Sequence, residues 1–399
     1  MNEKPRLVEL KSTSAVTVGS LLQEKADSQG DSTALVYHQR NKSYTYRDFN
    51  CISRQVAKGL LALGTARGEH VAVLAPNLPE WLFVLFGCAK AGAPLVTVNT
   101  NYRTFELEYT LKQSDAAMLF LADGAGQQGE YLEAIYEICP ELKTAQPGEL
   151  KAVRLPELRN VIFLGEEKQP GMFSWEEFLT KGEDVTDGEL DTREQALKPD
   201  DVFTIQYTSG TTGVPKGAML THGAYINNSA AIAQRQRLSP QDTVCIPLPF
   251  FHAYGYLTII SAITAGSIIA AVERFRAQDM LLVMENCRAT AVSGTPTMFV
   301  AALEELSARP YNLSALRGGN MAGAPCPPEL VKAVVEKMGA SKFGVLYGST
   351  ECLITIMNTP DAALEHRAGT IGRVMPDIEL KVIDPRTGQE TPAGVQGEL

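Results

Sequence analysis

Apolar residues recur along the first part of the chain in two alternating patterns. Phe49, Ile52, Val56 and Leu60 lie three or four positions apart, which is the spacing of one face of a helix. A continuous apolar run at 71–74 follows, and short runs of this kind are typical of buried strands. The alternation predicts an α/β fold with largely parallel sheets.

Capping and turn residues indicate where further elements begin and end. Thr45 and Asp48 resemble a capping box. Pro79 can open a helix that Gly92 closes, and Thr104 can cap another. The remaining expected elements are strands at 95–98, 117–121, 289–292 and 343–346, a helix capped by Thr221, and a helix from Pro327–Pro328 to Gly339.

Three stretches depart from this alternation. Between residues 140 and 199, Pro, Gly and charged residues surround one apolar run at 161–164, which predicts an exposed connecting region. Residues 254–272 carry no charge over a length that nearly spans a bilayer. Their glycines and serines favour a buried helix followed by a buried strand. From Gly372 onward we expect short strands and a turn at 384–388.

Composition limits the classes of function. The 399 residues are 45% hydrophobic, which is ample for a large core. The formal net charge is −10, so we expect no nucleic-acid partner. Seven scattered cysteines without a C-x-x-C pair indicate free thiols in a cytoplasmic protein. The N-terminal residues lack the apolar core of a secretory signal.

Residues 207–222 carry the strongest candidate chemistry, and they read Tyr-Thr-Ser-Gly-Thr-Thr-Gly-Val-Pro-Lys-Gly-Ala-Met-Leu-Thr-His. Glycines let successive backbone N–H groups turn toward one anion, and hydroxyls and a lysine add donors for a polyphosphate. Pro215 stands where the common nucleoside-triphosphatase loop has its second glycine. For any few of these residues, a polar turn remains the alternative. The candidate phosphate contacts are Thr208, Ser209, Gly210, Thr211, Thr212, Gly213 and Lys216.

A second polar run follows the strand expected at 343–346. Open α/β sheets bind ligands at the carboxyl ends of their strands. Tyr347 offers a face for stacking on a base, Thr350 can donate to a phosphate, and Glu351 can hold Mg²⁺. Taken alone, this run is equally well a strand-end turn with an exposed glutamate.

Together the two runs resemble the diagnostic motifs of the acyl-adenylate-forming (AMP-binding) superfamily, which includes acyl-CoA synthetases, peptide-synthetase adenylation domains and beetle luciferases. The resemblance implies ATP and Mg²⁺ as cofactors, with Tyr347 against adenine and Glu351 on the metal. It implies catalytic roles for Lys216, Thr350 and Glu351. The further nucleotide contacts that it implies are Gly323, Ala324, Pro325, Gly348 and Ser349.

The run from Pro247 to Gly255 resembles a third motif of the superfamily. In acyl-CoA synthetases the residue at the position of His252 lies between the acyl pocket and the channel for the CoA thiol, which implies a catalytic role. No acidic residue stands between Pro247 and Val272, which argues against an amino-acid substrate, because a buried ammonium group needs a counter-charge. The acyl contacts implied by the resemblance, each of which core packing would also explain, are His252, Met298, Gly319, Asn320, Met321 and Gly348.

The resemblance also implies the fold of the superfamily's large N-terminal domain. That domain has two mixed, largely parallel sheets sandwiched by helices in an α/β/α/β/α arrangement, followed by the start of a small β-barrel subdomain. We expect the first sheet within residues 1–200, the second sheet with the nucleotide site within 201–371, and an incomplete β subdomain at 372–399. Relatives continue with a ribose-binding segment and a C-terminal domain. We therefore expect an N-terminal portion that binds ligands but is poorly active.

The run from Arg317 to Pro325 most resembles the medium-chain fatty acyl-CoA synthetases. This implies ATP-dependent activation of a carboxylic acid to acyl-AMP and pyrophosphate, followed by transfer to CoA. The alternatives are an aryl or alicyclic carboxylate-CoA ligase, an adenylation domain serving a carrier protein, and a non-catalytic ATP- or AMP-binding module. The resemblance leaves a homodimer open.

Overall fold

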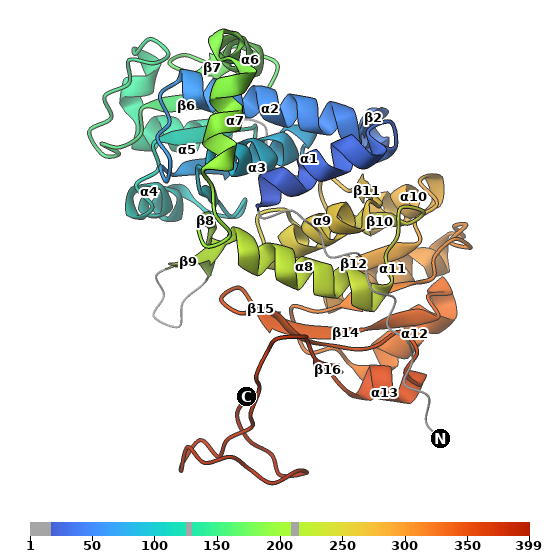
Figure 1. The fold of residues 1–399 in the computed structure, drawn as a ribbon. Coiled ribbons are helices and arrows are strands. Elements are labelled where there is room, and N and C mark those ends of the chain that lie inside the picture. The colour runs from blue at the N-terminus through green and yellow to red at the C-terminus, as the bar shows by residue number, and fades with distance from the viewer. Residues whose placement is uncertain (1–16, 125–129, 209–214) are drawn as a thin grey trace.

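Two β-sheets form the framework of the protein, with helices between them and on both outer faces (Figure 1). The computed structural model describes residues 17–124, 130–208 and 215–399. Most neighbouring strands in both sheets run parallel. Parallel sheets need apolar cover on both faces, and the helices supply it.

The seven-stranded sheet has the order β7-β6-β5-β3-β4-β8-β9. All its neighbours are parallel except β8 and β9, which form an antiparallel hairpin. Its strands are β3 (Val71–Leu74), β4 (Leu95–Thr97), β5 (Met118–Leu121), β6 (Asn160–Phe163), β7 (Phe173–Ser174), β8 (Val202–Thr208) and β9 (Lys216–Thr221).

The nine-stranded sheet has the order β16-β15-β14-β13-β12-β10-β11-β1-β2. Its centre is parallel, and antiparallel strands flank both ends. Its strands are β1 (Thr33–Tyr37), β2 (Lys42–Thr45), β10 (Thr243–Ile246), β11 (Ile268–Ala271), β12 (Ala291–Gly294), β13 (Gly318–Met321), β14 (Lys342–Ser349), β15 (Leu353–Met357) and β16 (Arg373–Val374).

The helices divide into three layers. The core between the sheets includes α1 (Val18–Gln29), α2 (Tyr46–Ala62), α3 (Pro79–Ala91), α8 (His222–Gln236) and α9 (Ala253–Ala265), and α6 (Trp175–Lys181) and α7 (Asp187–Gln195) extend it at one edge. Helices α4 (Thr104–Gln113) and α5 (Glu130–Ile138) cover the outer face of the seven-stranded sheet. Helices α10 (Ala277–Asn286), α11 (Pro296–Ala308), α12 (Pro328–Met338) and α13 (Leu364–Gly369) cover the nine-stranded sheet, and short 3₁₀ turns lie at His38–Arg40, Pro140–Lys143 and Gly182–Asp184. This arrangement confirms the predicted fold class.

Local sequence signals account for most helix ends. Thr45 caps α2 in a capping box with Asp48, and Thr221 caps α8. Gly92, which the sequence predicts to close this helix, ends α3 in the left-handed conformation. The cap predicted at Thr104 is wrong by one residue. Arg103 is the N-cap, because its backbone N–H donates to the Glu106 carboxylate.

The structure corrects two expectations about organisation. The sheets do not divide at residue 200, since β1 and β2 join the nine-stranded sheet while β8 and β9 belong to the other. Apolar periodicity locates strands but does not tell which strands become neighbours. Residues 140–199 are not simply an exposed connection either, because they contribute β6, β7, α6 and α7. In α6 and α7 the buried residues are Phe178 and Leu190, one in each helix, and both helices are otherwise rich in charged residues. One buried apolar position per helix is too few to predict an amphipathic helix from the sequence.

The uncharged stretch at 254–272 forms the buried helix α9 and the buried strand β11, as predicted. Helix α9 has 13 residues. In the described parts of the chain, no helix combines the length and apolar character needed to cross a membrane.

The last residues leave the two sheets as an extended arm (Figure 1). Strand β16 pairs with β15, so residues 373–374 belong to the nine-stranded sheet rather than to a separate unit. In the arm, Ile383 forms isolated bridges with Glu390 and Glu398. The predicted turn at 384–388 is present, because the Gly388 N–H donates to the Asp384 carbonyl over 2.8 Å.

His222 makes the stability of the fold dependent on pH. Its Nδ1 accepts a hydrogen bond from the Val18 N–H over 3.2 Å, and its ring stacks on Phe203. Burial lowers the pKa of His222 to about 4. The unfolded chain, with a histidine pKa of about 6.5, takes up this proton first as pH falls. Acid therefore favours unfolding.

We predict that His222 contributes about 3 kcal/mol of stability at neutral pH that is lost between about pH 6.5 and pH 4. His222→Asn keeps an acceptor for Val18 and should flatten this part of the profile, measured by urea unfolding across that range. His366→Asn, at an exposed position, is the matched control. An unchanged profile in the His222 variant would contradict the assignment.

Candidate active site

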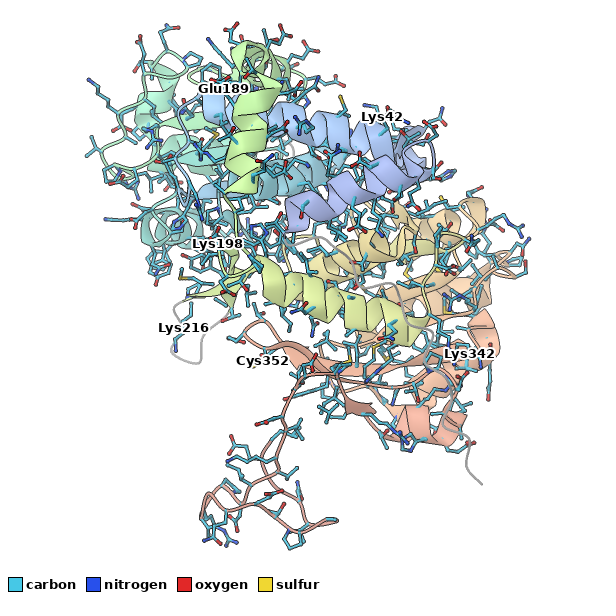
Figure 2. The ribbon with its side chains drawn as sticks, viewed as in Figure 1. Lys42, Glu189, Lys198, Lys216, Lys342 and Cys352 are labelled. Atoms are coloured by element: carbon cyan, nitrogen blue, oxygen red, sulfur yellow. The ribbon has the colours of Figure 1, made fainter. Side chains whose placement is uncertain are left out.

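The first predicted motif lies at the tip of the β8–β9 hairpin. Thr208 ends β8, Lys216 begins β9, and the two residues pair across the hairpin. The Lys216 side chain is exposed at this tip (Figure 2). The predicted contacts Ser209, Gly210, Thr211, Thr212 and Gly213 lie outside the described residues.

The second motif lies at the tip of the β14–β15 hairpin, in the other sheet. Strand β14 extends to Ser349, so Tyr347 and Gly348 belong to the strand rather than following it, and Thr350 and Glu351 form the turn. Tyr347 is 46% exposed, which leaves its ring free for stacking. Cys352 marks this tip, on the same side of the molecule as Lys216 (Figure 2).

The two hairpin tips meet although they come from different sheets. The Thr208 hydroxyl lies 3.5 Å from a carboxylate oxygen of Glu351. Hydroxyl, carboxylate and phosphate oxygens are the ligands that Mg²⁺ prefers, and it usually takes one or two carboxylates and keeps several waters. The described residues contain no cluster of three or more His, Cys, Asp or Glu side chains that could hold a metal. The exposed Glu351 carboxylate offers one such oxygen ligand.

A cavity of about 720 Å³ opens beside the β14–β15 hairpin. Its described lining contains no Asp or Glu. Cys326, which the sequence did not single out, also lines it, and burial raises the pKa of this thiol to about 11. Eight predicted site residues contribute to its wall, namely His252, Gly323, Ala324, Pro325, Tyr347, Gly348, Ser349 and Thr350.

His252 stands at the start of α9, where its Nδ1 accepts a hydrogen bond from the Tyr254 N–H over 3.3 Å. The ring is exposed to the cavity, yet the surrounding protein displaces enough water to lower the pKa of His252. The imidazole is therefore neutral at physiological pH, with its proton on Nε2 because Nδ1 accepts.

Asn77 supports the loop that carries His252. Its side-chain amide donates to the carbonyls of Leu248 and Val272, both over 2.9 Å, and accepts from the Phe250 N–H over 2.8 Å. Asn77 follows β3, so this buried side chain ties one sheet to a loop of the other. The sequence analysis missed it. The available signal was a single amide side chain among apolar residues, three positions after the strand.

Four predicted acyl contacts do not line the large cavity. Met298 and Met321 are buried in the core, the latter against the outer helices α10 to α12. Gly319 has φ +147, and a Cβ there would lie 1.8 Å from the Val292 carbonyl oxygen. This glycine is thus required by the close approach of two strands.

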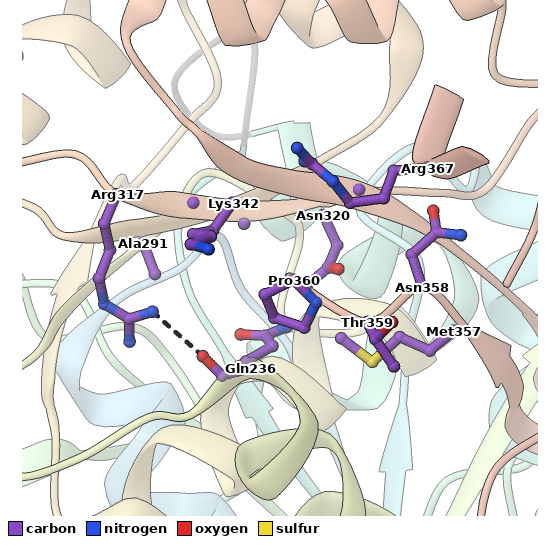
Figure 3. Close-up of a pocket in the computed structure, with 13 residues that line it drawn as sticks. Gln236, Ala291, Arg317, Asn320, Lys342, Met357, Asn358, Thr359, Pro360 and Arg367 are labelled. Atoms are coloured by element: carbon purple, nitrogen blue, oxygen red, sulfur yellow. Dashed lines mark hydrogen bonds between the residues drawn. The ribbon is translucent and has the colours of Figure 1, made fainter. Parts of the chain in front are cut away.

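Asn320, the fourth, lines a separate small pocket (Figure 3). The volume there is about 10 Å³, which suits about one water molecule. The Arg317 guanidinium donates to the Gln236 carbonyl at one side of this pocket. No partner for the Asn320 side-chain nitrogen exists in the described part of the chain.

The model of the AMP-binding enzyme family matches residues 22–399. The chain belongs to this family. The resemblance drawn from the motifs is thereby confirmed.

Individual relatives agree with the family. The chain is 44% identical over 385 residues to YngI of Bacillus subtilis (strain 168), and the alignment covers 96% of this chain and 70% of YngI. It is 36% identical over 392 residues to the bovine mitochondrial medium-chain acyl-CoA ligase ACSF2, covering 96% of this chain and 63% of the ligase. Among solved structures, the anthranilate CoA ligase AuaEII in complex with anthranoyl-AMP has a TM-score of 0.78 at 25% identity, covering 96% of this chain and 67% of that one.

A substitution at Gly348 tests whether the β14–β15 hairpin takes part in AMP binding. A Cβ at Gly348 would lie 2.0 Å from the Leu353 carbonyl oxygen, so Gly348→Ala must displace the backbone of the hairpin tip. We predict a loss of AMP affinity of about 10-fold or more by calorimetry, because main-chain shifts of this kind displace Tyr347 and Thr350. Gly188→Ala, where a Cβ meets nothing within 4 Å, is the control. Equal affinities for both variants would contradict the assigned site.

Proposed function

We propose that this protein activates a carboxylic acid with ATP, giving acyl-AMP and pyrophosphate, and that the acyl group then passes to CoA. The observation that carries the proposal is that the β8–β9 hairpin, at Thr208, meets the β14–β15 hairpin, at Glu351, beside a cavity whose described lining has no carboxylate. The proposed reaction is that of an AMP-forming acid-thiol ligase. Membership of the AMP-binding enzyme family supports it.

The first step replaces one phosphorus–oxygen bond by another. A carboxylate oxygen of the acid attacks the α-phosphorus of ATP, and the bond from that phosphorus to the bridging oxygen breaks. Pyrophosphate leaves with the electron pair of the broken bond. In the second step the thiol sulfur of CoA attacks the acyl carbon, AMP leaves, and the thiol proton passes to solvent. No protein nucleophile is required.

The chain's own residues supply electrostatic stabilisation and orientation. The Lys216 ammonium and the hydroxyls of Thr208 and Thr350 donate toward phosphate oxygens, where negative charge is concentrated. Glu351 would hold Mg²⁺, which when bound offsets charge on the phosphates. Tyr347 and the segment 323–325 form two walls that suit an adenine ring.

The cavity favours an uncharged acyl substituent. Its described lining carries no acidic side chain that could pair with an ammonium group. We propose a medium-chain fatty acid, supported by 36% identity to the bovine medium-chain acyl-CoA ligase ACSF2. An aryl carboxylate is the second candidate, favoured by the fold shared with the anthranilate CoA ligase AuaEII at 25% identity.

Other features bear on acceptor and compartment. His252, at the cavity wall, is neutral and can donate from Nε2 toward the acyl carbonyl oxygen of acyl-AMP as the CoA thiol approaches. The seven cysteines are all free thiols, which supports a reducing compartment such as the cytoplasm.

The chain spans 70% of the length of YngI and 63% of the length of ACSF2. Transfer of the acyl group to CoA is therefore proposed for the whole protein.

The deciding experiment is titration calorimetry of the 399-residue chain with a non-hydrolysable medium-chain acyl-AMP mimic. We predict tight binding that weakens about 10-fold or more in Lys216→Ala and in Glu351→Ala, the latter only with Mg²⁺ present, since each removes a charge-assisted contact. Lys198→Ala removes another exposed lysine and is the control.

The outcomes separate the candidates. Preference for a benzoyl-AMP mimic over the medium-chain mimic would favour the aryl alternative. Binding of AMP alone, with no gain from either acyl group, would favour a non-catalytic nucleotide-binding module. Failure of the folded chain to bind any of these ligands would overturn the proposed function.

A further inference from the structure

Helix α8 connects the two hairpins that form the nucleotide site. It begins at His222, directly after β9, and runs for 15 residues. In Figure 1 it crosses from the β8–β9 hairpin toward β14 and β15. Because the hairpins belong to different sheets, their relative position depends on what links this helix to β15.

Asn228 makes the link nearest the site. Its side-chain nitrogen donates to the Ile354 carbonyl over 2.8 Å, and its side-chain oxygen accepts from the Ile354 N–H over 3.2 Å. The amide thus pairs with both main-chain groups of one residue, as a neighbouring strand would. Two such bonds fix both the distance and the rotation of the backbone at Ile354.

The backbone beside Ile354 needs such support. Leu353 is buried and has φ +58, a conformation that is a genuine outlier for a bulky residue. Its carbonyl oxygen would lie 2.0 Å from a Cβ at Gly348. One residue farther on, the pairing of β14 with β15 shifts register. Strain of this kind persists only where the surroundings determine the conformation, and Asn228 contributes two bonds to that determination.

Arg235 links the far end of the same helix. Its guanidinium donates to the carbonyls of Met357, Arg373 and Val374 over 3.1, 2.8 and 3.1 Å. Arg235 therefore holds the base of the hairpin, and Asn228 holds the part that leads to Glu351. The Arg235 bonds are sufficient to attach α8 to the base of the β14–β15 hairpin. The Asn228 bonds act closer to Glu351, on the residue after Leu353.

We propose that Asn228 is a positioning residue that holds Glu351 at the correct distance from the Thr208–Lys216 hairpin. The proposal rests on the proposed function, because it assigns Asn228 a role in binding the triphosphate of ATP. A triphosphate with its metal must satisfy both hairpins at once through several phosphates, whereas AMP has a single phosphate and depends less on the distance between the hairpins. Loss of Asn228 should therefore weaken ATP binding more than AMP binding.

The test compares Asn228→Ala and Asn228→Asp with Asn227→Ala, which removes a neighbouring exposed asparagine of the same helix. Asn228→Asp keeps the side-chain volume and removes the donor to Ile354. Calorimetry with Mg²⁺–ATP and with AMP is the first readout. We expect both Asn228 variants to lose about 10-fold or more in Mg²⁺–ATP affinity and less than about 3-fold in AMP affinity. The Asn227 control should match the wild type.

Hydrogen exchange is the second readout, and it does not depend on ligand. The Ile354 amide should exchange faster in Asn228→Ala, which removes its acceptor, while amides of the outer helix α12 keep their protection. Equal loss of ATP and AMP affinity in the Asn228 variants, or unchanged Ile354 exchange in Asn228→Ala, would overturn the positioning role. Absence of nucleotide binding by the wild-type chain would instead overturn the proposed function, which keeps the two failures distinct.

Discussion

The structure depends on the apolar layer between the two sheets, because that layer brings groups from both sheets together. Trp81 on α3 contacts Phe250 and Tyr256 with ring centroids 5.5 and 5.7 Å apart. Phe203 and Tyr225 extend this cluster toward α8. Aromatic pairs of this geometry contribute about 0.5–1.5 kcal/mol each beyond the area they bury. Their edge-to-face packing also fixes orientation, so the sheets cannot slide without breaking several contacts together.

Polar side chains then refine what the apolar layer positions approximately. Asn77 joins β3 to the loop before His252, and Asn228 joins α8 to β15. Both bond to main-chain groups of another segment. A buried hydrogen bond adds only about 1 kcal/mol to stability, yet leaving its partner unpaired costs more. Such bonds therefore specify one arrangement rather than supplying most of the folding free energy.

The sequence predicts those parts of the structure that rest on local signals. Capping at Thr45 and Thr221 and the left-handed Gly92 follow from a few neighbouring residues, and the motifs at 207–222 and 347–351 are contiguous. Contacts across the layer were not predictable in this way. Nothing near Asn228 in the sequence indicates that it bonds Ile354, 126 positions later. Met321 and Asn320 were expected in the acyl pocket from the family resemblance, but strand alternation along β13 and the order of neighbouring strands decide which face each one meets.

Charge explains why the site needs short-range contacts. The protein carries a formal net charge of −10, so its overall field repels an anionic nucleotide, although salt screens that field beyond about 8 Å. In the proposed function, attraction comes from groups within contact distance, such as Lys216 and a metal ion that Glu351 would hold. Such interactions weaken steeply when their geometry loosens. A protein that binds a polyanion against its own net charge is therefore unusually sensitive to the distance between the two hairpins, and this gives a physical reason for tying α8 to β15 at two points.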